Sequence, residues 1–331
     1  MSSRVHIVFP SDSSVTPAGA ETVDIDSSWR LFVRGDVVWT VQTYCVLKER
    51  GIDGLSCGYE FDPSAINISH VDVLTRLNPG PDVFLVAIRA DKHRQVYPDI
   101  EIVQNQSQSG RFRFFVPHWP QPGLIRRNAT RQTVSNIAYS GAAHHIRAVD
   151  SLITADTKRK IREMGLNLVY LDPMNWNNYS RVDVLLGIRD FDRETHDHKP
   201  PSKLINAWLA RVLFIGGHDS AFSQIGEPGR DFVRVDSEEQ LLEQLHRLRQ
   251  DPYYYRSLVD NGTQKAQSFS REAIAKEWLT LLTGPIESRY CQWRNRPLAV
   301  RKVLFWTRRL VGRGRRVGTR RKKTKGAVTA L

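Results

Sequence analysis

Basic and hydroxyl side chains gather where the sequence predicts a helix to begin, at residues 202–210. Lys199, Ser202 and Lys203 lie at or just before this helix start. The free N–H groups and the dipole of a helix N-terminus favour a phosphate, and a nearby lysine adds a positive charge. We therefore predict a phosphate site here, with a solvated basic first turn as the alternative. Asn206, one turn into the helix, is expected either to hydrogen-bond a ribose hydroxyl or to cap a backbone group.

A further basic side chain, Arg189, follows a strongly apolar strand predicted at residues 182–188. In open parallel sheets, ligands bind outside the carboxyl ends of the strands. Arg189 is therefore expected at that edge, where its guanidinium would neutralise a diphosphate. The alternative is a surface salt bridge.

Three side chains in the first half of the chain are candidates for proton transfer. His70 and Asp91 each follow a predicted strand, and His118 lies in a proline-rich segment at residues 117–128. Any of them, placed beside a hydroxyl, would serve as a general base. For His118 a structural hydrogen bond is the alternative.

Several reaction classes are disfavoured because their motifs are missing. No Gly-x-Gly-x-x-Gly follows the first predicted strand, which argues against a dinucleotide oxidoreductase. The chain also contains no Walker, Gly-x-Ser-x-Gly or His-Glu-x-x-His sequence. We expect no metal and no cofactor. The alternative is a metal site at His144, His145, His196 and His198 if the fold gathers them, but unpatterned histidines are usually not ligands.

The elements that must position these side chains form two alternating α/β series. The first series has a predicted helix at 36–50 and strands at 5–9, 55–59, 66–68, 83–88, 100–104 and 112–116. The second has strands at 136–140, 167–171, 182–188, 212–216 and 231–235, and helices at 155–164, 202–210, 237–250, 252–268 and 271–282. Such alternation is typical of parallel sheets with crossover helices. Ser237 and Ser270 are expected to cap two of the closing helices.

The proline-rich segment at residues 117–128 is the best boundary between the two series. We predict a first domain at residues 1–130, a second domain at 131–287 and a basic tail at 288–331. Both domains are expected to be Rossmann-like and to face each other. The carboxyl ends of both sheets would then line one cleft.

The net charge of +13 is concentrated in the tail. Residues 288–331 carry 15 of the 48 lysines and arginines and no acidic residue, so the rest of the chain is close to neutral. This distribution disfavours specific nucleic-acid binding. No apolar run approaches the roughly 20 residues of a membrane-spanning helix, and no signal-peptide core is recognisable. We therefore expect a cytoplasmic protein whose three cysteines are free thiols.

The tail predicts an amphipathic helix over residues 298–311, after Pro297. Trp306 falls at the boundary of its two sides, and Phe305 breaks the separation. The sides are formed by Val300, Val303, Leu304, Leu310 and Val311 and by Arg301, Lys302, Arg308 and Arg309. An amphipathic helix followed by a basic run binds anionic membrane surfaces. We predict that residues 298–325 hold the protein peripherally at an inner membrane face; the alternative is a helix packed on the body with a solubilising tail.

The stretch DHKPPSKLINAWLA at residues 197–210 resembles a motif of bacterial GT-B glycosyltransferases. In that family a Lys-Pro-x-x-Lys-Leu-x-Asn-Ala-Trp run opens the donor-side helix of the C-terminal domain. FVPHWPQPGLIRRN at residues 115–128 resembles the interdomain linker, and NIAYSG at 136–141 resembles the first strand of the C-terminal domain. Residues 231–270 resemble the closing strand and helices, so the resemblance covers about residues 4–283.

The resemblance implies a GT-B fold and a glycosyltransferase like the group 1 retaining enzymes, which act in cell-surface polysaccharide or glycolipid synthesis. The donor would be a nucleotide-diphosphate sugar, and the acceptor a hydroxyl, with a lipid-linked sugar as one option. The implied donor site comprises Gly141, Arg189, Lys199, Ser202, Lys203 and Asn206. An inverting reaction would take its base from His118, His70 or Asp91, whereas in a retaining reaction the donor phosphate takes the proton.

The chain departs from the family at the acidic positions. Two glutamates eight positions apart in many relatives correspond to His198 and Asn206, and neither is a carboxylate. The usual glycine and proline after the helix are replaced by Arg211 and Leu213, and no Arg/Lys pair follows Gly141. A catalytically inactive nucleotide- or sugar-binding protein is therefore the alternative function.

Overall fold

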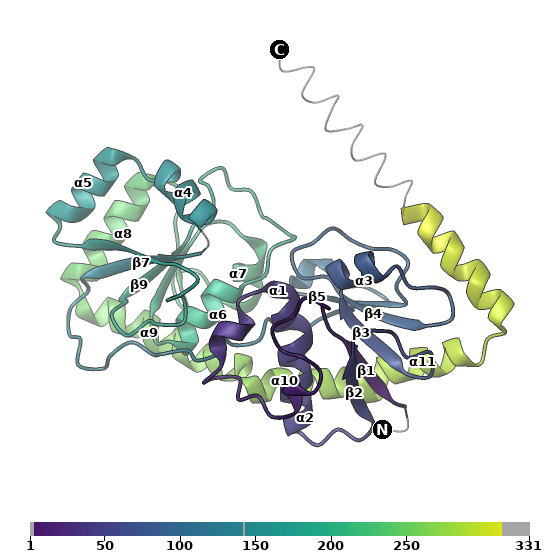
Figure 1. Ribbon diagram of the computed structural model, residues 1–331. Helices are drawn as coiled ribbons and strands as arrows, with labels where there is room; N and C mark the ends of the chain where they lie inside the picture. Colours follow the sequence, from purple (N-terminus) through teal and green to yellow (C-terminus); the bar gives the residue numbers. More distant parts are fainter. Residues whose placement is uncertain (1–2, 142, 313–331) are drawn as a thin grey trace, which may run out of the picture.

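The computed structural model describes residues 3–141 and 143–312. Figure 1 shows two α/β units side by side, each built on one sheet with helices packed against it. The fold class expected from the sequence, two Rossmann-like units of parallel strands and helices, is confirmed. The part of the predicted membrane contact beyond residue 312 lies outside the described residues.

The first sheet has six parallel strands in the order β2-β1-β3-β4-β5-β6. The strands are β1 (Val5–Val8), β2 (Leu55–Gly58), β3 (Ile66–His70), β4 (Phe84–Ile88), β5 (Ile100–Val103) and β6 (Arg113–Phe115). Every residue of β3, β4 and β5 is buried. Their continuous apolar runs are typical of a parallel sheet covered on both faces.

Alternate side chains of β4 belong to two different cores. Phe84, Val86 and Ile88 pack with a helix made of α1 (Gly35–Val37), a π-helical turn (Val38–Gln42) and α2 (Thr43–Glu49). Leu85 and Ala87 point to the other face, where α3 (Val71–Leu77) packs. The period of two along a strand thus divides the unit into two layers of helices around one sheet. Short 3₁₀ helices at Gly19–Glu21, Trp29–Phe32 and Gln106–Gln108 connect the larger elements.

The second sheet has five parallel strands in the order β11-β10-β9-β7-β8. The strands are β7 (Asn136–Ser140), β8 (Asn167–Leu171), β9 (Val184–Gly187), β10 (Leu213–Gly216) and β11 (Val233–Arg234). The helices are α4 (Ala143–Leu152), α5 (Ala155–Glu163), α6 (Ser202–Leu209), α7 (Ser220–Ile225), α8 (Glu238–Gln250) and α9 (Pro252–Ala266), followed by a 3₁₀ turn at Gln267–Phe269. Helices α5, α8 and α9 share a core with one face of this sheet, and α6 and α7 share a core with the other.

A buried carboxylate ties the second half of the linker to the second sheet. Asp183, which is fully buried, accepts hydrogen bonds from Arg127 Nε at 2.9 Å and from Arg131 Nη2 at 2.6 Å. It also accepts the backbone N–H groups of Ser135 and Asn136. Burial alone would raise the pKa of Asp183, but these donors hold it below its ordinary value, so the charge is retained.

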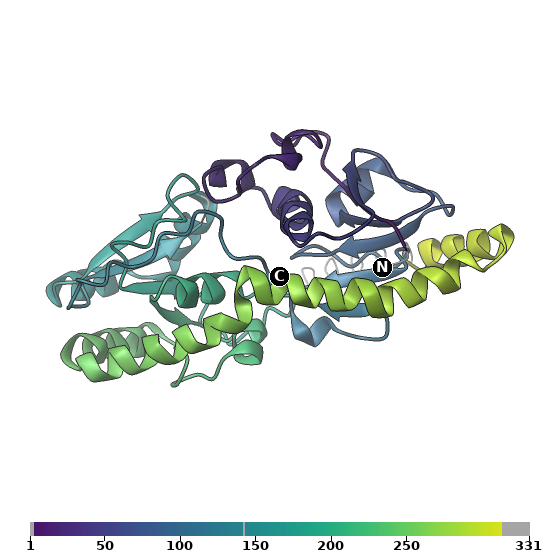
Figure 2. The ribbon, with the colours of Figure 1, turned by 90° about the horizontal axis from the view of Figure 1, so that it is seen from below.

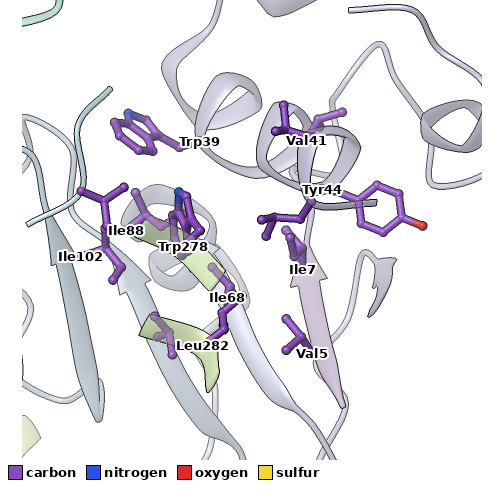
Figure 3. Packing of buried hydrophobic residues seen from close by; sticks show 14 of the residues in the cluster. Val5, Ile7, Trp39, Val41, Tyr44, Ile68, Ile88, Ile102, Trp278 and Leu282 are labelled. Atoms are coloured by element: carbon purple, nitrogen blue, oxygen red, sulfur yellow. The ribbon is translucent and has the colours of Figure 1, made fainter. Parts of the chain in front are cut away.

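The chain finally returns from the second unit to the first. The helices α10 (Arg271–Leu281), a π-helical turn (Leu282–Ile286) and α11 (Glu287–Arg294) run on from α9 beneath both units, as Figure 2 shows. Trp278 and Leu282 enter the first core beside Trp39 and Ile88 (Figure 3). The predicted division of domains at residues 130 and 287 stays a prediction. The packing shows that the helices after residue 270 bury their apolar side chains in the first unit.

A last helix spans residues 298–312 and packs on the same face of the first sheet as α3. Phe305, the residue that broke the predicted amphipathic pattern, is the one that docks: it is buried with Leu85 and Ala87 and meets Tyr97 edge to face at 5.8 Å. Arg308 donates to Asp99 at 2.8 Å. The apolar stripe predicted from the sequence is left exposed.

We expect Trp278→Ala to lower the free energy of unfolding by about 3–5 kcal/mol, the usual cost of truncating a buried tryptophan. Its side chain is fully buried in a core shared by helices and strands far apart in the sequence. Trp306→Ala, at a position that is half exposed, should cost about 0.5 kcal/mol or less. Urea unfolding of both variants measures this difference. Equal midpoints would mean that α10 does not stabilise the first core.

Candidate active site

A cleft of about 420 Å³ lies between the two units. It opens at the carboxyl ends of β3 and β4 and at the start of α6, where ligands bind in open parallel sheets. Its walls include Arg34, Asp36, Trp39, His70, Asp91 and His118 from the first unit and Pro200 and Ser202 from the second. All three predicted proton-transfer residues therefore line one cleft together with a predicted donor-site residue.

His70 is held as a hydrogen-bond donor. The residue caps α3, and its Nδ1 accepts the backbone N–H of Asp72 at 3.2 Å. Only 1% of His70 is exposed, and burial lowers its pKa, so the ring stays neutral near neutral pH. A neutral imidazole that accepts at Nδ1 carries its proton on Nε2. This Nε2 is buried without a hydrogen-bond partner among the described residues, which leaves it available to a ligand oxygen in the cleft.

His118 is held in the opposite tautomer. Its Nδ1 lies 2.7 Å from the carbonyl oxygen of Trp119, which can only accept a hydrogen bond. The proton is therefore on Nδ1, and Nε2 keeps its lone pair. The ring packs edge to face on Trp39 with centroids 5.0 Å apart, and burial lowers its pKa. Of the two histidines, His118 has the form that accepts a proton.

The third proton-transfer candidate, Asp91, forms an ion pair across the cleft. Its carboxylate lies 3.0 Å from the ammonium of Lys199, which belongs to the second unit. Burial would raise the pKa of Asp91, but the hydrogen bond and charge of Lys199 lower it below its ordinary value. Asp91 is thus a weaker base than a free carboxylate, and two residues predicted for separate roles neutralise each other.

A second link across the cleft comes from Asn105 at the carboxyl end of β5. Its side-chain amide donates to the carbonyl of Lys199 at 3.2 Å and to Ser220 Oγ at 2.9 Å. Asn105 is almost completely buried. Together with the Asp91–Lys199 pair, this contact holds the loop before α6 against the first unit.

The basic donor-site candidates form a cluster beside Ser202. Arg189 donates to Asp219 at 2.6 Å, and Asp219 is itself buried, so the guanidinium is held in place. The ammonium of Lys203 stands 3.9 Å from the ring centroid of Tyr139. Burial and the charge of Arg189 lower the pKa of Lys203 to about 7. No carboxylate pairs with Lys203 among the described residues, so this site favours an incoming anion.

The remaining residues predicted for the sugar-donor site mainly form hydrogen bonds with backbone groups or begin a helix. The N–H of Gly141, at the end of β7, donates to the carbonyl of Leu171. Asn206 accepts the N–H of Gln121 at 3.1 Å and so fixes the linker to α6. Ser202 begins α6, whose first turn receives no side-chain cap, and it lines the cleft. His198, at the position of a glutamate in many relatives, is exposed.

Tyr139, Asp219 and Asn105 were missed by the sequence analysis although each shapes the site. Asp219 and Asn105 follow predicted strands at residues 212–216 and 100–104, as Arg189 follows its own strand. The same argument about carboxyl ends would have found both. Tyr139 lies inside a predicted strand, and nothing in the sequence relates it to Lys203.

One group of side chains in the described part of the chain has ligand atoms close enough for a cation. It consists of Asp190, Glu194 and His196, whose ligand atoms lie within 4.8 Å of one another. Asp190 and His196 already form a pair at 2.6 Å. The side chains of His144 and His145, also considered from the sequence, lie outside what the structure describes.

The chain was compared with known families, curated sequences and solved structures, and solved structures show which fold it has. No family model and no curated protein sequence matches the chain. Among solved structures, AviGT4, a glycosyltransferase involved in avilamycin A biosynthesis, aligns with a TM-score of 0.50 at 12% identity over 85% of this chain and 98% of its own. A mutant of S. aureus TarM in complex with fondaparinux, α-GlcNAc-glycerol and UDP aligns with a TM-score of 0.50 at 8% identity over 73% of this chain.

The fold is that of the GT-B glycosyltransferases. The alignment with AviGT4 extends over nearly the whole of that protein, whereas it spans 59% of TarM. At these identities the likeness concerns the arrangement of the two units. Among the described residues, no helix has the length and apolar character needed to cross a bilayer.

We expect Lys203 to titrate near neutral pH. In protein labelled with ¹³C-lysine, one side-chain resonance should move with a midpoint of about 7, whereas ordinary lysines titrate near about 10.4. The Lys203→Arg variant should lose that resonance and no other. Inorganic pyrophosphate should shift the midpoint upward, because a bound anion stabilises the charged form. A spectrum in which every lysine titrates above about 9 would contradict the burial of this ammonium.

Proposed function

We propose that this protein is a glycosyltransferase that moves a sugar from a nucleotide-diphosphate donor to a hydroxyl acceptor. The proposal rests on one observation: the cleft of a GT-B fold combines two neutral histidines in opposite tautomers with an uncapped helix start beside an unpaired lysine. The histidines come from the first unit and the phosphate-binding features from the second. Transfer requires that both substrates are held next to each other, and here each unit would hold one of them.

The charge of the leaving diphosphate would be stabilised by the second unit. As the bond between the anomeric carbon and the diphosphate oxygen breaks, negative charge grows on that oxygen. Arg189 and the first N–H groups of α6 are positive and held in place before the reaction, and the Lys203 amine is held over Tyr139. Preorganised positive groups at such a point lower the barrier. Bound diphosphate also returns Lys203 to its charged form.

Proton transfer from the acceptor would involve the first unit. As the new bond to the anomeric carbon forms, the acceptor hydroxyl loses its proton to Nε2 of His118 in an inverting reaction, or to the donor phosphate in a retaining one. His70 donates Nε2–H to a sugar or acceptor oxygen and takes no proton. Asp91 is disfavoured as the base because Lys199 holds its carboxylate.

A second candidate function is nucleotide or sugar binding without transfer. It is favoured by the two positions where many relatives carry glutamates. His198 is exposed, and the Asn206 side chain is committed to the linker. In that case the cleft would hold a nucleotide diphosphate or a sugar with no turnover.

Donor hydrolysis separates the two candidates. We expect the protein to release UDP or GDP from one of their sugar conjugates, since water replaces the acceptor hydroxyl slowly in such clefts. UDP is the first nucleotide to test because the matched TarM structure holds it. His118→Ala should lower the turnover number by about 10²–10⁴-fold with little change in nucleotide affinity if His118 is the base.

His93→Ala provides the matched control, because His93 is an exposed histidine of the same unit outside the cleft. Nucleotide binding without release from any donor would support the binding protein instead. Full activity of His118→Ala would remove the base role and favour proton transfer to the donor phosphate.

We further infer that the 298–312 helix contacts an anionic membrane surface from the cytoplasmic side. Its docking through Phe305 leaves an apolar stripe turned away from the body: Leu304, Trp306 and Val311 are exposed, and Val303 and Leu310 are 65% exposed. Exposed apolar residues in a continuous stripe mark an interaction surface. Basic residues 313–325 follow in the sequence, and a lipid-linked acceptor in polysaccharide or glycolipid synthesis would lie at such a surface.

Vesicle co-sedimentation tests the membrane contact. The Val303→Asn/Leu310→Asn variant should bind phosphatidylcholine vesicles containing phosphatidic acid at least about tenfold more weakly than the unchanged protein, because two apolar side chains are lost from the contact. Tyr253→Asn, at a position 82% exposed on the second unit, is the matched control. Truncation must spare residues up to 294, because Tyr290 and Trp293 belong to the first core. Equal binding of all three proteins would exclude the stripe as the contact.

A further inference from the structure

A groove of about 460 Å³ lies on the first unit, at the edge of the sheet opposite the cleft. It opens where β5 and β6 begin, whereas the cleft opens where parallel strands end. One wall comes from α11 and another from the 298–312 helix. Five arginines line it, from four different parts of the chain: Arg94, Arg111, Arg113, Arg289 and Arg308.

Two of these arginines are neutralised by buried acids. Arg308 donates to Asp99 at 2.8 Å, and Arg94 donates to Glu101 at 3.1 Å. Among the described residues, Asp99 and Glu101 are the only acids that line the groove. The groove therefore keeps an excess of three positive charges.

The three remaining guanidiniums, those of Arg111, Arg113 and Arg289, form no ion pair with a carboxylate among the described residues, although Asp99 acts electrostatically on Arg289 and Glu101 on Arg113. Arg289 and Arg111 lie over the same aromatic ring, Phe112, at 4.2 Å and 5.2 Å from its centroid. Arg113 follows directly at the start of β6. The Nε of Arg289 is buried and has no hydrogen-bond partner in the part of the chain that the structure describes. Burial and the neighbouring charges of Arg296, Arg308 and Arg111 lower the pKa of Arg289 by more than the carboxylate of Asp99 raises it, so an anion here would offset the remaining repulsion.

The groove is continuous with the exposed stripe of the last helix. Thr307 and Val311 line the groove, and Val311 is half exposed. Phe305 and Arg308 fix this helix to the first sheet, so the distance between stripe and groove is set by packed groups. An apolar stripe beside an arginine groove presents the two chemistries of a phospholipid, acyl chains and phosphate, in adjacent positions.

We propose that this groove binds the phosphate of an anionic lipid headgroup, with Arg111, Arg113 and Arg289 as its ligands. Guanidinium groups bind phosphate oxygens in pairs, and clusters of basic residues recognise lipid phosphates. The proposal rests on the membrane contact inferred above. It adds a specific site to that contact and places it on the side of the sheet away from the sugar-transfer cleft.

The test compares two double variants of the full-length protein that remove equal charge. Arg111→Gln/Arg113→Gln empties part of the groove and breaks no ion pair with a buried acid. Arg30→Gln/Arg256→Gln removes two exposed guanidiniums that also lie over aromatic rings, but outside the groove. Binding is measured with vesicles of phosphatidylcholine, with and without phosphatidic acid. The groove variant should bind the anionic vesicles at least about tenfold more weakly than the control variant.

Soluble glycerol 3-phosphate separates a lipid from a free phosphate ligand. It should compete with anionic vesicles only weakly, since it lacks the acyl chains that meet the stripe. Equal loss of vesicle binding in both double variants would mean that only the total charge of the protein matters. That result would contradict the groove as a specific binding site. Competition by glycerol 3-phosphate as strong as that of the lipid would overturn the lipid as its ligand.

Two further measurements distinguish this proposal from those on which it depends. If the unchanged protein does not bind anionic vesicles, both the groove proposal and the membrane contact fail. Sugar transfer is still tested independently by the donor-hydrolysis assay. If the stripe variant loses vesicle binding and the groove variant does not, only the groove proposal fails. Nucleotide affinity should be the same in the groove variant and the unchanged protein, because the groove and the cleft share no lining residue.

Discussion

The burial of α10 and α11 in the first core is the interaction on which the rest of the structure depends. The chain crosses between the units twice, once through the linker and once through these helices, so the cleft is bounded by two connections. Trp278, Leu282 and Trp293 make the second connection an apolar one. Arg289 of α11 lines the groove where β5 and β6 begin. The same packing therefore also places Arg289 and the last helix at the edge of the sheet opposite the cleft.

Within the cleft, hydrogen bonds to fixed backbone groups determine what the side chains can do. His70 is buried and His118 is half-buried, and both are neutral. One accepts from an N–H and the other donates to a carbonyl, so their free nitrogens have opposite character. The Asp91–Lys199 pair removes one base and one cation from the cleft. Among the described residues Lys203 has no carboxylate partner, and its ammonium lies over the ring of Tyr139. Besides the ion-paired carboxylates of Asp36 and Asp72, the cleft therefore contains one histidine with a free lone pair and one with a free N–H, and the unpaired Lys203 lies next to Ser202.

The two edges of the first sheet serve opposite surfaces. The carboxyl ends of its strands face the second unit, and the amino ends of β5 and β6 meet the last helix and the arginine groove. A protein anchored through the groove and stripe would therefore keep its cleft away from the anchoring contacts. The proposed substrate site and the proposed membrane surface would then lie at opposite edges of one sheet.

Local patterns in the sequence were sufficient for the strands and most of the longer helices, whereas α3, α4, α7 and α11 were not predicted. Apolar runs bounded by glycine and proline predicted the strands, and Ser237 and Ser270 cap their helices as expected, since a cap requires only an N–H three residues away. The candidate residues at strand ends also reach the cleft, because parallel topology brings carboxyl ends to one edge. Only the tertiary structure decided the tautomers of the histidines, the pairing of Asp91 with Lys199 and the docking of Phe305. Each of these depends on a partner group that lies between one and more than two hundred positions away in the sequence. Sequence periodicity does not record the direction of that partner, and the side chain's proton, charge and burial follow from it.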